Sequence, residues 1–121
     1  MIRLMKDLPE SILGVFATEK ITGEDYETIL IPALEEKLKA NAKIRMIYHI
    51  DGDFTGFEFS ALWDDAKFGM KHLSEFERVA LVSDHEMINS IVRFFSYMIK
   101  SEIKIFKDRE LLEAKEWIIE T

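Results

Sequence analysis

Apolar residues along this chain recur with two periods, an alternation typical of strands and a three-to-four spacing typical of helices. The run at 43–50 is apolar at alternate positions from Ile44 to Ile50, and Ile47 is apolar on the opposite side. A strand that is apolar on both faces is typical of the centre of a sheet that is covered on both sides. Alternating or continuous apolar runs predict strands at 1–5, 12–18, 43–50, 78–82 and 102–107.

Segments with helical spacing lie between and after these strands. The first contains Pro32, which we expect to kink the helix or to split it in two, because proline lacks the backbone N–H that a helix interior needs. The predicted helices cover residues 22–40, about 57–73, 85–100 and 108 onward.

Three of these helices begin at residues that favour helix N-termini. Thr22 with Asp25 forms a variant of the capping box, and Ser83 with Glu86 matches its usual form. Asp108 is the expected cap of the last helix.

The order of elements, β-β-α-β-α-β-α-β-α, predicts a single α/β domain that covers residues 1–121. Strands that are separated by helices imply right-handed crossovers and a mostly parallel sheet of four or five strands. The first two strands are close enough to form an antiparallel hairpin at one edge, and four helices should flank the sheet. Gly14 in the second strand suggests a bulge or close packing.

Composition narrows the function classes. The 121 residues carry a net charge of −7, which argues against nucleic-acid binding because that function needs a basic face. There is no cysteine, so disulfides, thiol catalysis and cysteine-ligated metals are excluded. No apolar stretch is long enough to span a membrane, and residues 1–11 lack the apolar region of a signal peptide. We therefore expect a cytoplasmic protein that is not embedded in a membrane.

Catalytic motifs are missing from the sequence. The three histidines show no metal-ligand spacing, and neither a phosphate-binding loop nor a nucleophile elbow occurs. Asp51-Gly52-Asp53 follows a predicted strand, but these residues are also typical of turns. An enzyme would need several of Asp51, Asp53, Asp65 and His85 to converge. We expect no catalytic residue, no metal and no cofactor.

Aromatic residues are the unusual feature of this chain. The predicted helix at 85–100 has an inward stripe, Ile88, Ile91, Val92, Phe95, Met98 and Ile99, and a second stripe, Met87, Phe94 and Tyr97, beside it. An apolar arc wider than one buried face implies an interface or a ligand groove, simple burial being the alternative. The candidate ligand or partner surface consists of Phe54, Phe57, Trp63, Phe68, Phe94 and Tyr97.

Several stretches together resemble the SpoIIAA-like family of small bacterial proteins, and the resemblance covers nearly the whole chain. They are DY at 25–26, IPAL at 31–34, DFTGF at 53–57, ALWDDAKFG at 61–69, FERVALV at 76–82, IKIF at 103–106 and AKEWI at 114–118. The family is similar in fold to STAS domains, the class of anti-sigma-factor antagonists, and to CRAL-TRIO lipid-binding domains. The resemblance implies a STAS-like sheet of four or five strands with four flanking helices.

The resemblance also implies two kinds of function. STAS antagonists bind a kinase partner and are switched by phosphorylation of a serine in a D-x-S-G-like motif at the start of the second helix. The equivalent stretch here is Asp53-Phe54-Thr55-Gly56, so Thr55 or Ser60 would have to serve as the phospho-switch. We expect a non-enzymatic, anti-sigma-factor-antagonist-like binding domain that acts through protein–protein interaction, as a homodimer. The alternative, which the CRAL-TRIO likeness implies, is a carrier or sensor of a small apolar ligand or lipid in a shallow groove between helices.

Overall fold

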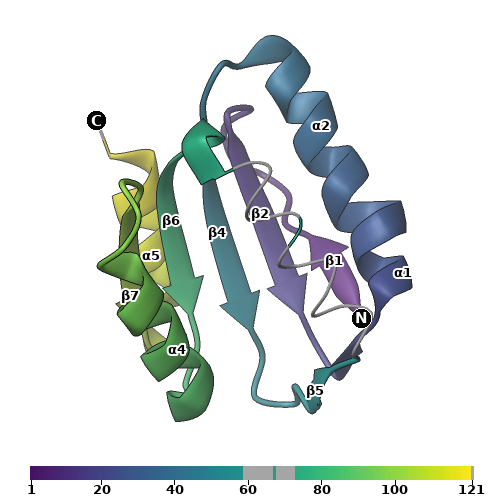
Figure 1. Cartoon of the computed structure of the whole chain (residues 1–121), viewed down its shortest axis with the longest axis vertical. Helices are drawn as coiled ribbons and strands as arrows, with labels where there is room; N and C mark the ends of the chain where they lie inside the picture. Colours follow the sequence, from purple (N-terminus) through teal and green to yellow (C-terminus); the bar gives the residue numbers. More distant parts are fainter. Residues whose placement is uncertain (59–66, 68–72, 121) are drawn as a thin grey trace.

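A five-stranded sheet forms the centre of the computed structural model, which describes residues 1–58, 67 and 73–120. Strand β1 pairs antiparallel with β2, and every other pair of neighbours in this sheet is parallel. The predicted α/β fold, with an N-terminal antiparallel hairpin and an otherwise parallel sheet, is confirmed. In spatial order the strands are β1 (Ile2–Leu4), β2 (Ile12–Ala17), β4 (Ile44–Ile50), β6 (Phe76–Val82) and β7 (Glu102–Phe106) (Figure 1).

A second, two-stranded sheet lies beside the first and was not predicted. Strand β3 (Lys20–Ile21) pairs in parallel with β5 (Gly56–Phe57). Each strand has two residues, which is too short for a period of two to be recognised in a sequence. Phe57, which the helical spacing placed at the start of a helix, therefore lies on a strand.

The first helical segment begins at Thr22, as predicted. The Thr22 hydroxyl accepts from the Asp25 N–H, and the Asp25 carboxylate accepts from the Thr22 N–H at 2.8 Å. Pro32 does not split the segment. A turn of π-helix, in which Ile31 N–H reaches Tyr26 O, directly precedes it, so the proline lies in the first turn of α2, where a missing backbone N–H is tolerated. The segment comprises α1 (Gly23–Asp25), η1 (Tyr26–Leu30) and α2 (Ile31–Ala40).

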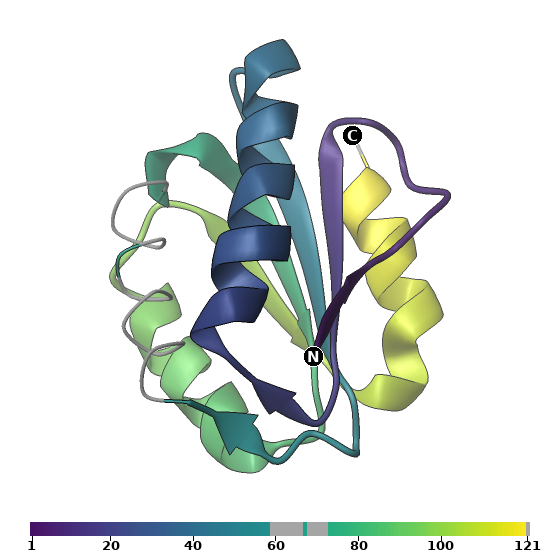
Figure 2. The same ribbon diagram turned by 90° about the vertical axis from the view of Figure 1, so that its right-hand side faces the viewer.

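The helices cover both faces of the main sheet. Helices α2 and α4 (Glu86–Ser96) lie on one side and α5 (Leu111–Ile119) lies on the other (Figure 2). Two short 3₁₀ turns, η2 (Leu73–Glu75) and η3 (Asp108–Glu110), precede β6 and α5.

Two predicted helix caps were wrong. His85 is the N-cap of α4, while the Ser83 hydroxyl accepts from the His85 N–H two residues ahead. Glu86 forms an ion pair with Lys107 at 2.8 Å, so a tertiary contact replaces the predicted capping box. Asp108 begins the 3₁₀ turn rather than capping α5, whose N-cap is Glu110.

The hydrophobic core has two halves, one on each face of the sheet. Alternate residues of β4 from Ile44 to Ile50 contribute to the half under α2, and Ile47 contributes to the half under α5. The two-faced central strand is therefore confirmed. Of the two alternatives predicted for Gly14, a bulge or close packing, the structure shows close packing. A Cβ at this position would lie 2.5 Å from Leu8 Cδ1 and 2.6 Å from Met5 Cβ.

The predicted helix at about 57–73 lies mostly outside the described residues. Within the described part of the chain, no helix has the length and apolar character that crossing a membrane requires.

Candidate functional site

The outer side of α4 carries an exposed apolar surface. Exposed fractions range from 51% for Ile91 to 83% for Tyr97, although side chains of this size are usually buried. The surface, which we call the α4 face, consists of Met87, Ile91, Phe94 and Phe95 on α4, together with Tyr97 and Met98, which directly follow this helix.

A narrow inner stripe holds α4 on the sheet. Ile88 and Val92 pack against the core, and buried Asn89 donates from Nδ2 to the carbonyl of Ser83 at 2.8 Å. The helical spacing had also placed Ile91, Phe95 and Met98 inward, and the structure leaves all of them exposed. Because one helix rests on a sheet through a limited arc, the rest of this wide apolar arc remains outside.

The predicted surface residues divide into two groups. Phe94 and Tyr97 are exposed on the α4 face, with the Phe94 ring 5.5 Å from that of Phe95. Phe54 and Phe57 are half-buried against the core, and their rings meet edge to face at 5.0 Å. Trp63 and Phe68 lie outside the described residues.

Of the two candidate phosphorylation sites, Thr55 lies within the described residues. Thr55 is exposed in the loop before β5, where its backbone N–H donates to the carbonyl of Glu19 at 2.8 Å. Ser60 lies outside the described residues. Phosphorylation of either hydroxyl stays a prediction.

A polar cluster lies where β4, β6 and β7 end. His49 Nε2 is 3.6 Å from Asp108 Oδ1, which is too long for a hydrogen bond, and both atoms are buried without a hydrogen-bond partner among the described residues. Burial lowers the pKa of His49 and raises the pKa of Asp108, so burial favours the uncharged form of each group. Asp108 N–H donates to Asp84 Oδ1 at 3.0 Å.

The residues that an enzyme would need meet only in part. A ring nitrogen of His85 lies 3.0 Å from the backbone carbonyl of Asp51, and the ring contacts Phe54 edge to face. Asp53 is exposed, and Asp65 lies outside the described residues. No cluster of three or more potential metal ligands occurs within the part of the chain that the structure describes.

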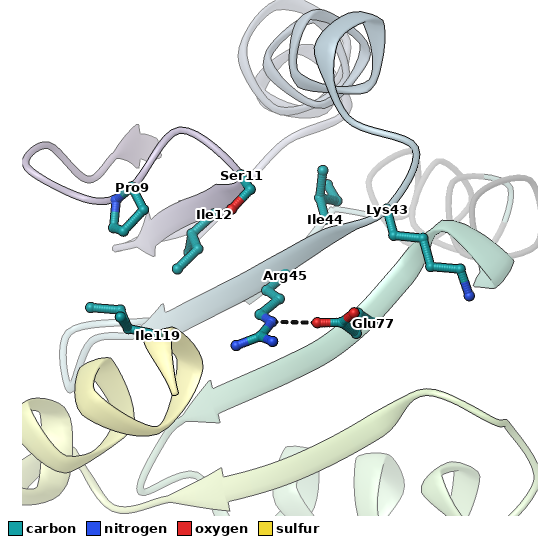
Figure 3. A pocket seen from close by; sticks show the side chains of 8 residues that line it. All are labelled: Pro9, Ser11, Ile12, Lys43, Ile44, Arg45, Glu77 and Ile119. Carbon is teal, nitrogen blue, oxygen red and sulfur yellow. Dashed lines mark hydrogen bonds and ion pairs between the residues drawn. The ribbon is translucent and has the colours of Figure 1, made fainter. Parts of the chain in front are cut away.

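Two hollows lie at the opposite end of the sheet, where the parallel strands begin. One has a volume of about 310 Å³ and lies among Ile12, Ile44 and Ile119, with the Arg45–Glu77 ion pair at 2.6 Å on its wall (Figure 3). The guanidinium of Arg45 is held by the protein itself, because it also donates to the carbonyl of Ile118 at 2.9 Å.

The second hollow has a volume of about 590 Å³ and is partly apolar. Phe76, Met98 and Ile99 supply its apolar wall, and Lys43 and Lys100 stand beside them. Sequence reasoning missed this hollow, because its residues come from segments far apart in the chain. The broad apolar arc of the helix at 85–100 was the one signal that pointed toward Met98.

Comparisons with known proteins agree on the fold. The sequence model of a protein family described as SpoIIAA-like matches residues 12–119. The structure is similar to the crystal structure of an uncharacterized protein of the DUF3478 family from Shewanella loihica, described as having a SpoIIAA-like fold. The two chains are 30% identical with a TM-score of 0.77, over 98% of this chain and 92% of that one. A search of curated proteins found no match.

Proposed function

Because this chain belongs to the SpoIIAA-like family, we propose that it is a non-enzymatic cytoplasmic binding and regulatory domain that acts through protein–protein interaction. The resemblance suggests an anti-sigma-factor-antagonist-like role. The observation that carries the proposal is the α4 face, an apolar surface on a helix whose opposite side is anchored in the core.

The size of the α4 face supports a protein partner. Six large side chains that are more than half exposed offer roughly 700 Å² of apolar surface. The largest apolar patch of a typical monomer covers about 300–600 Å², and a standard interface buries about 800 Å² on each partner. The α4 face is thus large enough to form the centre of an interface.

Site-specific photo-crosslinking in cells tests this proposal. A benzophenone amino acid in place of Phe94 should form crosslinks to protein, because position 94 lies within the α4 face. The same group in place of Glu36, on the exposed side of α2, is the matched control. The proposal fails if position 94 yields no more crosslinked protein than position 36.

One observation favours a second function, the binding of a small apolar ligand. The hollow bordered by Phe76, Met98 and Ile99 has a volume within the range of about 300–1,000 Å³ that is common for ligand sites. Lys43 and Lys100 suit a ligand with an apolar body and an anionic end. Native mass spectrometry of protein purified without added ligand tests this idea, which requires an extra mass that is lost on denaturation.

A further inference from the structure

We infer that the occupant of the α4 face is a second copy of this chain, packed helix against helix in antiparallel orientation about a two-fold axis. This inference rests on the proposed function and names its partner. It concerns four residues of the α4 face, Met87, Ile91, Phe94 and Met98, which we call the outer stripe.

The spacing of the outer stripe suits helix pairing. Its members are separated by four, three and four residues, so Met87, Ile91 and Phe94 line one side of α4, and Met98 continues this spacing in the turn that follows Ser96. The spacing is the same when it is read in either direction. An antiparallel copy therefore places Met87 opposite the partner's Met98 and Ile91 opposite the partner's Phe94, and a two-fold axis passes through the middle of the stripe.

The chemistry of the surface also favours a second copy. Homodimer interfaces have apolar centres enriched in aromatic residues and methionine, and the outer stripe consists of two methionines, an isoleucine and a phenylalanine. Phe95 and Tyr97 flank this stripe and add apolar area on either side. The roughly 700 Å² of the whole α4 face approaches the 800 Å² or so that each partner buries in a standard interface.

Charge at the helix ends supports the antiparallel orientation. Glu86 is exposed in the first turn of α4, where its own-chain contact is Lys107, and Lys100 is exposed beyond the last turn. Antiparallel packing brings Glu86 toward the partner's Lys100 at both ends of the interface. Parallel packing would instead bring like charges together.

Sedimentation velocity over a range of concentrations tests self-association. The unmodified chain should show a monomer–dimer equilibrium, and Ile91→Glu should raise the dissociation constant at least about tenfold, because it places a carboxylate in an apolar interface. Lys39→Gln is the control, since it changes the net charge by the same single unit on the exposed side of α2. A chain that remains monomeric at about 100 μM, well above the micromolar constants of weak complexes, overturns the inference.

Cysteine crosslinking tests the orientation, and the natural chain contains no cysteine to interfere. Met87→Cys and Met98→Cys proteins, mixed and oxidised, should form a disulfide-linked dimer, while either variant alone should form much less. Because residue 98 of one chain faces residue 87 of its partner, two copies of the same variant would hold their cysteines roughly 16 Å apart, the approximate rise over the eleven positions from 87 to 98, beyond the roughly 7 Å that a disulfide permits. Efficient linkage of Met87→Cys alone would show parallel packing and would overturn the inference.

Sedimentation velocity, read together with photo-crosslinking at position 94 and with vesicle binding, separates this inference from the proposed function. A monomer whose position 94 still crosslinks to another protein contradicts self-association and leaves the proposed function standing. A monomer that cosediments with phosphatidylcholine–phosphatidylserine vesicles, and loses this binding with Ile91→Glu, identifies a lipid surface as the occupant and overturns the inference. A dimer that Ile91→Glu does not weaken also overturns it, because the contact then lies elsewhere.

Discussion

Arg45 and Arg78 lie opposite each other in the register of β4 and β6, and both guanidinium groups donate to the carbonyl oxygen of Glu120. Arg78 also donates to the carbonyl of Trp117 at 3.1 Å. The last carbonyls of a helix have no partner within the helix, and the negative end of its dipole attracts cations. Two neighbouring strands therefore hold the C-terminal end of α5 against the sheet.

Replacing one of these arginines should loosen α5. We expect Arg78→Gln to lower the free energy of unfolding by about 1–3 kcal/mol, the usual range for hydrogen bonds that involve a charged donor. Urea unfolding followed by circular dichroism measures this change. Lys39→Gln should stay within about 0.5 kcal/mol, since Lys39 lies on the surface. Equal effects of the two substitutions would contradict the anchoring role of Arg78.

Gly14 and Gly52 should respond differently to the same substitution. An added Cβ at Gly14 meets Leu8 and Met5 below 3 Å, whereas one at Gly52 meets nothing within 4 Å. We expect Gly14→Ala to cost about 1–3 kcal/mol of stability through overpacking, and Gly52→Ala to cost less than about 0.5 kcal/mol. Urea midpoints compare the two variants. A Gly14→Ala protein as stable as the original chain would show that this close contact is unimportant.

His49 should make the fold less stable in mild acid. Burial lowers the pKa of His49 below the ordinary value of about 6.5, and the negative charges of Asp108 and Asp51 partly oppose this lowering. The unfolded state then binds the proton more readily, so stability is retained above pH 6.5 or so and declines as the pH falls through the lower, folded pKa. We expect His49→Gln to reduce this decline.

Proton NMR titration of the His49 ring, together with urea unfolding at several pH values, checks this prediction. The ring should titrate below the value measured in the unfolded chain. A ring that titrates above that value would mean that Asp108 dominates over burial, and the sign of the pH dependence would reverse.

Two aromatic residues of the predicted surface should differ in their effect on stability. Phe94 is 64% exposed, so Phe94→Gln should leave the free energy of unfolding of the monomer, measured at a protein concentration too low for self-association, within about 0.5 kcal/mol. Phe54 packs against Phe57 and His85, so Phe54→Ala should cost about 1–3 kcal/mol. Thermal and urea unfolding measure both. A large loss of monomer stability at Phe94 would assign this residue to the core and remove it from the α4 face.

The sequence predicted the central architecture because the relevant signals are local. The two apolar faces of β4 follow from the side-chain alternation of a strand, and this alternation does not depend on distant residues. The Thr22–Asp25 capping box joins residues three positions apart, so it could also be recognised directly.

Predictions failed where a distant residue competed for the same group. Ser83 and Glu86 match a capping box, but Lys107 forms an ion pair with Glu86 across 21 positions of sequence. The β3–β5 pairing likewise joins two dipeptides that carry no recognisable period of their own.

The candidate site shows the same division. The sequence by itself determined that the helix at 85–100 has a broader apolar arc than one buried face needs, because composition and period specify the width of that arc. Only the tertiary structure decided which part of the arc is exposed. Ile88 and Val92 meet the core, while Ile91 and Phe94 do not. The physical reason is that burial depends on where a helix rests on its sheet, which long-range packing decides.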